Sequence, residues 1–276
     1  MNLEQARRFI ADTEQAGDVL RFPCHGGQAV WHRFGQGRPL VMLHGGHGSW
    51  LHWIRNIQAL SRAHEVWLPD MPGFGGSAEI PVHGMDGLVQ AMLAMLDEAF
   101  ADREIDLAGF SFGGLVAANI AAARPGRVRK LALLGSAGHG GPRRQTVDLV
   151  NWRHSTSQEA LHAVMRGNLA AHMLADPAAI DGLALTAHIR SCEQVQFRSK
   201  GISRTWKLDD ALRRVQAPVL MMWGEHDVTA DPALILPGLT EGHALREGLI
   251  LPGGGHWIQF ESADAVDARL EAWFAG

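Results

Sequence analysis

The sequence predicts an α/β protein with a mostly parallel eight-stranded sheet flanked by helices and an inserted helical lid. Short apolar segments of strand length alternate with segments of helical spacing over most of the 276 residues. This alternation is typical of a parallel sheet that is covered on both faces. Between residues 136 and 207 the strand signal disappears and only helical patterns remain. We therefore expect a core domain formed by residues 1–135 and 208–276, and a lid formed by residues 136–207.

Eight segments carry the strand signal, because each is short and rich in apolar or β-branched residues. In chain order they are residues 18–22, 28–34, 39–43, 65–68, 104–108, 130–134, 219–223 and 249–251. A turn at Gly26 and Gly27 joins the first two. In a parallel α/β sheet the functional residues lie beyond the carboxyl ends of the strands, so we expect catalytic residues in the loops that follow these strands.

Segments with apolar residues at helical spacing separate the strands. In the core they are residues 49–60, 88–100, 115–123 and 263–274, and in the insertion they are residues 157–174 and 177–196. A single crossover between neighbouring strands does not need a connection as long as this insertion. We therefore interpret it as a lid over the site rather than as ordinary crossover helices.

A candidate nucleophile lies in the turn between one of these predicted strands and the helix that follows it. The stretch Gly109-Phe110-Ser111-Phe112-Gly113 matches the G-x-S-x-G pattern of a nucleophile elbow. Glycine and serine also mark ordinary loops, so the pattern alone is weak. Its position between a predicted strand and a predicted helix is the context that the elbow requires, and we predict Ser111 as the nucleophile.

A base and an acid follow two later strands. His256 lies in a glycine-rich turn after residues 249–251, and Asp227 lies in the turn after residues 219–223. His256 would take the serine proton and then donate it to the leaving group. Asp227 would hold the imidazole in the correct tautomer and stabilise its charged form. Glu225 and Asp231 are the rivals of Asp227 for this role.

An oxyanion hole is predicted from the loop after residues 39–43, whose sequence is His-Gly-Gly-His-Gly. Glycines allow backbone N–H groups to point at the negative charge that develops during acyl transfer. The N–H groups of Gly46 and of Phe112, the residue after the serine, are the two predicted donors. The alternative is a plain glycine-rich connection between a strand and a helix.

The chain order Ser111, Asp227, His256 resembles that of the α/β-hydrolase-fold superfamily, and the resemblance covers nearly the whole chain. The stretch Asp-Met-Pro-Gly-Phe-Gly-Gly-Ser at residues 70–77 is similar to a loop of the same superfamily. This resemblance implies a lidded hydrolase with a serine nucleophile. A serine argues against haloalkane dehalogenases and epoxide hydrolases, whose chemistry requires a carboxylate nucleophile.

Within the superfamily, residues 53–57 and 255–261 resemble the meta-cleavage product hydrolases, which hydrolyse carbon–carbon bonds of vinylogous 1,5-diketones, and related carboxylesterases. In that group a Trp follows the catalytic His and an Arg associated with the lid assists the substrate. The matching residues here are Trp257 and Arg190, with Arg198 as a rival for the Arg. Phe110 and His52 stand where that group usually carries Asn. The predicted substrate-binding residues are Gly45, Phe110, Arg190 and Trp257.

The predicted function is therefore hydrolysis of a small, partly apolar substrate, through an acyl-enzyme or related tetrahedral intermediate. The bond cleaved is a carboxylic ester or the C–C bond of a vinylogous diketone. One alternative is a cofactor-free perhydrolase or haloperoxidase that uses the same residues. A second alternative is a non-catalytic receptor for a small molecule on the same fold, because fold alone does not establish function.

Composition limits the remaining classes. A net charge of −4 without long charged runs gives no nucleic-acid footprint. No apolar run reaches the length of a membrane span, and the two cysteines and the polar start of the chain favour a cytoplasmic protein. Although 15 His are present, none lies in a metal-binding motif, so we expect neither a metal nor a cofactor. The expected partner is a small-molecule substrate, and the oligomeric state stays open, with a homodimer as one option.

Overall fold

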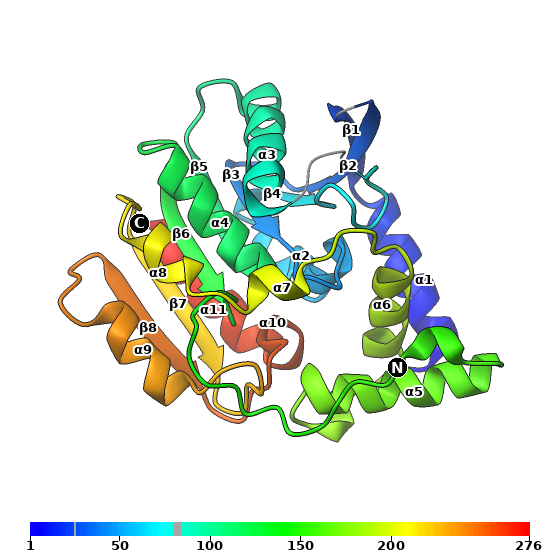
Figure 1. Ribbon diagram of the computed structural model, residues 1–276. Helices are drawn as coiled ribbons and strands as arrows, with labels where there is room; N and C mark the ends of the chain where they lie inside the picture. Colours follow the sequence, from blue (N-terminus) through cyan, green and yellow to red (C-terminus); the bar gives the residue numbers. More distant parts are fainter. Residues whose placement is uncertain (25, 80–83) are drawn as a thin grey trace.

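The computed structural model describes residues 1–24, 26–79 and 84–276, and it contains one eight-stranded sheet with the order β1-β2-β4-β3-β5-β6-β7-β8 (Figure 1). The strands are β1 (Asp18–Cys24), β2 (Gly27–Phe34), β3 (Arg38–Leu43), β4 (His64–Pro69), β5 (Ile105–Phe110), β6 (Val128–Leu134), β7 (Val219–Gly224) and β8 (Arg246–Leu251). Each coincides with one predicted segment, usually with one to three residues added.

Parallel pairing dominates the sheet. β1 pairs antiparallel with β2, and β2 pairs antiparallel with β4, whereas every pairing from β4 through β3, β5, β6 and β7 to β8 is parallel. The prediction of a mostly parallel, eight-stranded α/β sheet is confirmed. The carboxyl ends of β3, β5, β7 and β8 therefore meet at one edge of the sheet, where the predicted site residues follow them.

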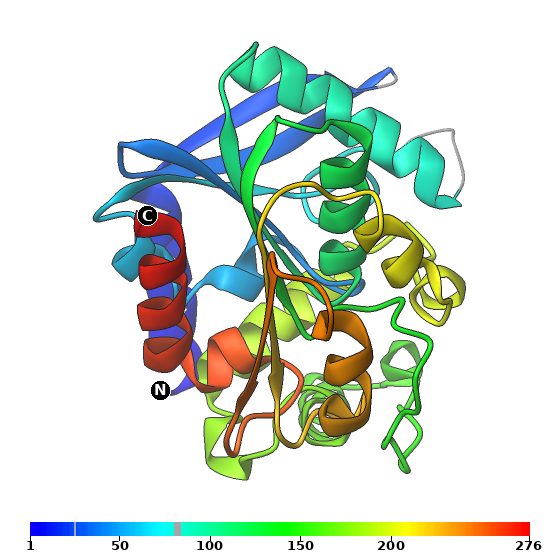
Figure 2. The ribbon, with the colours of Figure 1, turned by 90° about the vertical axis from the view of Figure 1, so that its left-hand side faces the viewer.

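Two hydrophobic cores lie on opposite faces of the sheet, because successive side chains of a strand point to opposite faces. On β3, Val41 and Leu43 belong to one core, and Leu40 and Met42 belong to the other. The first core packs beneath α3 (Gly84–Phe100), α4 (Phe112–Ala123), α8 (Lys207–Leu212) and α9 (Pro232–Thr240). The second packs beneath α1 (Leu3–Gln15), α2 (Ile57–Leu60), α10 (Ile258–Glu261) and α11 (Ala263–Ala275). Figure 2 shows α11 and α4 on opposite sides of the sheet.

The insertion that is expected to form the lid lies between β6 and β7. It contains α5 (Gln158–His172), α6 (Gly182–Glu193), the short α7 (Lys200–Ser203) and two single turns of 3₁₀ helix, η2 (Trp152–His154) and η3 (Pro177–Ala179). Residues 141–151, which we call the strap, contain no helix or strand. The division into a core and a lid at residues 136 and 207 stays a prediction.

The structure differs from the predicted elements at several places, among them the unpredicted α8 and the helix expected over residues 177–196, which is divided into η3 and α6. α1 was not predicted, because only Ala6 and Ile10 of this helix are buried and its apolar stripe is narrow. α9 was also missed. The single helix expected over residues 49–60 is broken into the 3₁₀ turn η1 (Trp50–Trp53) and α2, because the N–H groups of Ile54 and Asn56 donate to carbonyls three residues back rather than four.

Candidate active site

Ser111 lies on a sharp turn between β5 and α4. Its backbone has φ 53° and ψ −116°, a conformation that side-chain-bearing residues rarely adopt and that is maintained by the surrounding packing. A Cβ added to Gly109 would lie 2.4 Å from the carbonyl oxygen of Gly113, and one added to Gly113 would lie 2.3 Å from that of His44. Only glycine fits at these two positions, so the sequence pattern is what allows the turn to hold the serine at the edge of the sheet.

Three side chains from three loops form one hydrogen-bonded chain. His256 Nε2 lies 3.0 Å from Ser111 Oγ, and His256 Nδ1 lies 2.8 Å from Asp227 Oδ2. Asp227 is fully buried, and His256 is 3% exposed. The structure therefore brings together the three residues that the sequence predicted from separate segments.

Electrostatics favour an ionised Asp227. Burial alone raises the pKa of this carboxyl, but the neighbouring His256 and hydrogen bonds from His256 and Thr229 outweigh it, and the net pKa lies below its usual value. The backbone N–H of Thr229 donates to Asp227 Oδ1 at 2.7 Å, and its Oγ1 lies 3.1 Å from His256 Nδ1. Sequence reasoning missed Thr229. Its position two residues after an Asp, where the N–H can close an Asx turn, was the available signal.

The two rivals of Asp227 have other partners. Glu225 Oε2 accepts the backbone N–H of Gly253 at 2.9 Å, and the Glu225 side chain is 54% exposed. Asp231 Oδ1 pairs with the guanidinium of Arg144 at 2.5 Å. Neither carboxylate hydrogen-bonds to His256.

The predicted oxyanion loop, which joins β3 to η1, is held by two histidines. His44 Nε2 accepts the backbone N–H of Met71 at 3.0 Å, so its Nδ1, 2.9 Å from the carbonyl oxygen of Gly45, is the donor. His52 Nδ1 accepts the N–H of Gly45 at 3.1 Å. Burial lowers the pKa of His44 to about 4 and that of His52 well below its usual value, so both rings are neutral and can accept these bonds.

This arrangement leaves two backbone donors beside Ser111. The N–H of Gly45 is engaged by His52, whereas the N–H groups of Gly46 and Phe112 donate to no protein acceptor within the part of the chain that the structure describes. Phe112 begins α4, where the first N–H groups of a helix have no partner inside it. These two groups are the donors that the sequence predicted.

A cavity of about 710 Å³ lies over these residues, between the core and the insertion. Ser111, His256, Gly45, Gly46 and Phe110 line it on the core side. The strap, α5, α6 and α7 line it on the lid side, with Arg143, Gln145, Asn168, His172, His188 and Lys200 among the contributing residues. Gly45 and Phe110 therefore lie where substrate binding was predicted.

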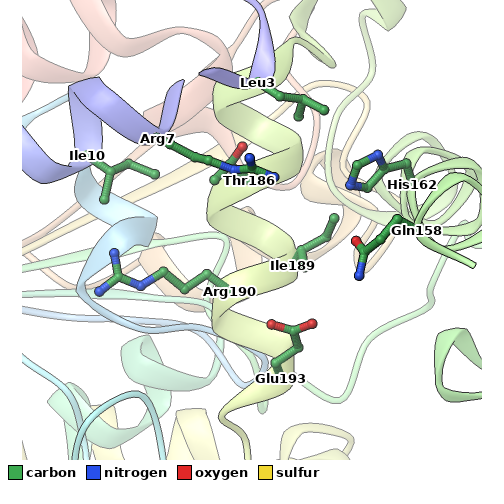
Figure 3. A pocket seen from close by; sticks show the side chains of 9 residues that line it. All are labelled: Leu3, Arg7, Ile10, Gln158, His162, Thr186, Ile189, Arg190 and Glu193. Carbon is green, nitrogen blue, oxygen red and sulfur yellow. The ribbon is translucent and has the colours of Figure 1, made fainter. Parts of the chain in front are cut away.

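The other two predicted substrate-binding residues do not face this cavity. Arg190 lies in a separate surface pocket of about 360 Å³ and pairs with Glu14 of α1 at 3.5 Å. Figure 3 shows Arg190 projecting from α6 on the side of α1, away from Gln158 of α5. Trp257 is fully buried beneath the site, where its Nε1 donates to the carbonyl oxygen of His52 at 2.9 Å. Arg198, the rival of Arg190, is exposed and is not among the residues that line the cavity.

The cations that do face the cavity were not predicted. They are Arg143 of the strap, Lys200 of α7 and Arg204 just after it. Burial, followed by the nearby Arg204, lowers the pKa of the Arg143 guanidinium. Within residues 1–24, 26–79 and 84–276, no carboxylate lies within 4.0 Å of any of these three cations. They are side chains of the lid insertion, whose inward face could not be identified from the sequence.

Over the described residues, no group of three His, Cys, Asp or Glu side chains is placed to bind a metal ion. None of the helices in the same part of the chain combines the length and the apolarity needed to cross a bilayer.

Comparison with known proteins places this site in context. A family model described as the α/β-hydrolase fold matches residues 38–167. The chain is 30% identical to the 2-hydroxy-6-oxo-6-phenylhexa-2,4-dienoate hydrolase of Burkholderia cepacia, over 84% of this chain and 86% of that protein. It is also 30% identical to the dihydrolipoyllysine-residue acetyltransferase component of the acetoin cleaving system of Pseudomonas putida, over 94% of this chain and 68% of that protein. The crystal structure of naproxen esterase from Bacillus subtilis superposes with a TM-score of 0.79 at 20% identity, covering 98% of this chain and 97% of that one.

A serine on a strand–helix turn, hydrogen-bonded to a buried His on this sheet, defines the class of protein as a hydrolase with a serine nucleophile. The chain belongs to the α/β-hydrolase fold family. The resemblance inferred from the motifs is therefore confirmed. The perhydrolase and receptor alternatives are not favoured, because the relatives include a named hydrolase of the same fold.

Proposed function

We propose that the protein hydrolyses a small, partly apolar ester that carries an anionic group, with Ser111 as nucleophile, His256 as general base and acid, and Asp227 as the orienting acid. The hydrogen-bonded chain from Ser111 Oγ through the imidazole to the buried carboxylate carries this proposal. The neighbouring N–H groups of Gly46 and Phe112 act as the oxyanion hole. Such a hole contributes about 3 to 4 kcal/mol of transition-state stabilisation per donor in well-studied cases.

Acylation follows from this geometry. Ser111 Oγ attacks the substrate carbonyl carbon while His256 Nε2 takes the serine proton. The carbonyl oxygen becomes an oxyanion facing the two backbone N–H groups. When the tetrahedral intermediate collapses, His256 gives its proton to the leaving oxygen, and the acyl group stays on Ser111. Asp227 stabilises the imidazolium that forms in between, and its lowered pKa keeps it ionised for this purpose.

The lining of the cavity supports an anionic substrate with an apolar part. Phe110, Leu149 and Met173 supply apolar surface, whereas Arg143 and Arg204 stand close together without a carboxylate partner in the described structure. Two neighbouring guanidinium groups repel each other, and an anion between them removes that repulsion. A substrate carboxylate is the group that fits such a pair bidentately.

A second candidate reaction is hydrolysis of the C–C bond of a vinylogous diketone. The relative from B. cepacia is named for hydrolysis of a dienoate, which also carries a carboxylate. This reaction requires the dienol to take up a proton at carbon before cleavage, so that a carbanion can leave. Ester cleavage needs no such step, and Phe110 adds no polar group beside the nucleophile to assist one. We therefore place ester hydrolysis first.

Substituting the nucleophile tests the proposal. Ser111→Ala should reduce turnover of p-nitrophenyl butyrate by a factor of about 10⁴ or more, because no other group on the core side replaces the serine. Circular dichroism should show the same fold in both proteins. Full turnover by the folded variant would refute the proposal. Measuring kcat/KM for aryl esters beside ring-fission dienoates would then decide between the two reactions. The cytoplasmic location remains a prediction, and a homodimer remains one option for the oligomeric state.

A further inference from the structure

His172 is a second imidazole of the site, and acylation as described above does not use it. It is the last residue of α5 and lines the cavity. Its ring centroid lies 5.5 Å from that of His256, with an angle of 58° between the planes. The backbone N–H of Trp257 donates to the carbonyl oxygen of Met173 at 2.7 Å, which ties the end of α5 to the loop that carries His256. This hydrogen bond therefore helps to hold the His172 ring beside the His256 ring.

The hydrogen bonds of Gln145 determine which nitrogen of His172 carries the proton. Gln145 Nε2 donates to the carbonyl oxygen of Val147 at 2.9 Å, and a carbonyl can only accept. This bond fixes the orientation of the amide, so Gln145 Oε1 is the atom that faces His172 Nδ1 at 3.1 Å. Because Oε1 can only accept, Nδ1 must be the donor. In the neutral ring the lone pair is then on Nε2.

The ring is neutral and its Nε2 is free to accept. Burial, and then the charges of His256 and Arg143, lower the pKa of His172 well below its usual value. Within the described residues, Nε2 has no hydrogen-bond partner, and the side chain borders the cavity. The lid thus places an unused acceptor beside the general base.

We propose that His172 Nε2 orients the water molecule that hydrolyses the acyl-enzyme. Once Ser111 is acylated, its Oγ no longer donates to His256 Nε2, and a water can take its place. One hydrogen of this water points at His256 and the other at His172, leaving an oxygen lone pair for the acyl carbon. A water makes such hydrogen bonds at about 2.8 Å each, and the 5.5 Å between the ring centroids keeps the two imidazoles close enough for one water to bond to both.

Deacylation proceeds through a second tetrahedral intermediate. The water oxygen forms a bond to the acyl carbon, and the proton that pointed at His256 moves to its Nε2. The second water hydrogen stays on the attacking oxygen throughout, hydrogen-bonded to His172. The tetrahedral intermediate then collapses, the bond from carbon to Ser111 Oγ breaks, and Oγ takes back the proton from His256. His172 exchanges no proton, which suits a ring that stays neutral. The inference rests on the acyl-enzyme of the proposed function.

The test separates acylation from deacylation. In His172→Phe, which keeps a ring without an acceptor, stopped-flow measurements with p-nitrophenyl butyrate should show acylation within about twofold of the parent. Deacylation should be about 10- to 100-fold slower, the size expected when a reactant loses its orientation. An acyl adduct on Ser111 should then accumulate and be visible by mass spectrometry. His172→Gln carries a carbonyl oxygen that can replace Nε2, and it should recover most of the deacylation rate.

Gln145→Leu tests the same idea without changing the ring. Without the Oε1 acceptor, the proton can move from Nδ1 to Nε2, and deacylation should again slow selectively. Unchanged deacylation in the folded variants would overturn the role of His172, as would equal slowing of both steps, which indicates a structural role. Neither result contradicts the proposed function. The proposed function is contradicted if Ser111→Ala retains turnover or if the acyl adduct forms on another residue.

Discussion

At the scale of single residues, the site depends on positions where close contacts with neighbouring atoms allow only one type of residue. Ser111 has a strained backbone because glycines on both sides let the turn pack against the loop of His44. The turn at Ser111 could be predicted from the sequence, because the G-x-S-x-G pattern places glycines where the turn requires them. The direction in which the Arg190 side chain points could not be predicted. On α6, His188 and Cys192 are one turn apart and face the cavity, so the residue halfway between them points to the opposite side of the helix.

Arg143 is predicted to select anionic substrates. Arg143→Gln removes one of the two neighbouring guanidinium groups, so kcat/KM for mono-p-nitrophenyl glutarate should fall by about 10- to 100-fold, the value of a charge-assisted hydrogen bond. The neutral ester p-nitrophenyl butyrate should be affected by less than about threefold. Steady-state kinetics on both esters check this.

Arg190→Gln is the matched control for that prediction, because Arg190 lies in a different pocket and pairs with Glu14. It should leave the preference for the charged ester unchanged. If the preference for the charged ester changes in Arg190→Gln and not in Arg143→Gln, Arg190 is the substrate-binding residue, as the sequence predicted.

At the scale of elements, strands were easier to predict than helices. The inner strands β3 to β7 are short, nearly continuous runs of buried residues, such as β7, whereas the edge strands β1 and β8 are largely exposed or half-buried. Helices whose buried face is small or interrupted leave a weak pattern. α1 buries two side chains, and α9 contains Pro237, a residue that is strongly disfavoured inside a helix. The strap cannot be predicted at all, because it has no repeating structure and is held by tertiary hydrogen bonds.

The strap is held at one point by backbone–backbone hydrogen bonds and at another by a side chain. The N–H groups of Arg144 and Gln145 both donate to the carbonyl oxygen of Val228, next to Asp227. Further along, the amide of Asn168 in α5 makes two hydrogen bonds with the backbone of Val150, of 2.8 and 2.9 Å. A single side chain thus replaces both partners that a neighbouring strand would offer.

Asn168→Ala should release this part of the lid. Two backbone groups of Val150 lose their partner, so the strap should be cleaved faster in limited proteolysis, and KM should rise several-fold because the strap lines the cavity. Peptide mapping should locate the new cleavage within residues 141–151. Asn119→Ala, which removes a hydrogen bond within α4, is the control and should leave the strap intact. An unchanged cleavage pattern in Asn168→Ala would show that the strap is held mainly by other contacts.

At the scale of the whole molecule, buried histidines should make the fold sensitive to acid. Burial lowers the pKa of His32, His44 and His188 to about 4 in each case. Between pH 6.5 and 4 the unfolded chain therefore binds more protons than the folded one, and stability falls as the pH decreases. Asp70 and Asp267 act in the opposite direction, because burial raises their pKa values to about 7 and about 6.

The histidines outnumber these two carboxyls, so the net effect should be a loss of several kcal/mol between pH 7 and pH 4.5, since each pKa unit is worth about 1.4 kcal/mol. Urea unfolding followed by tryptophan fluorescence across this range measures it. A free energy of unfolding that is constant or increases toward pH 4.5 would mean that the buried rings become protonated without cost.

The central claim is that Ser111 is the nucleophile, and covalent labelling tests it most directly. A fluorophosphonate that mimics the tetrahedral intermediate should react with one site per chain and abolish ester hydrolysis. Mass spectrometry of the digested protein should place the label on the peptide that contains Ser111, and Ser111→Ala should take up no label. Stoichiometric labelling at a different residue, or full activity in the labelled protein, would contradict the account.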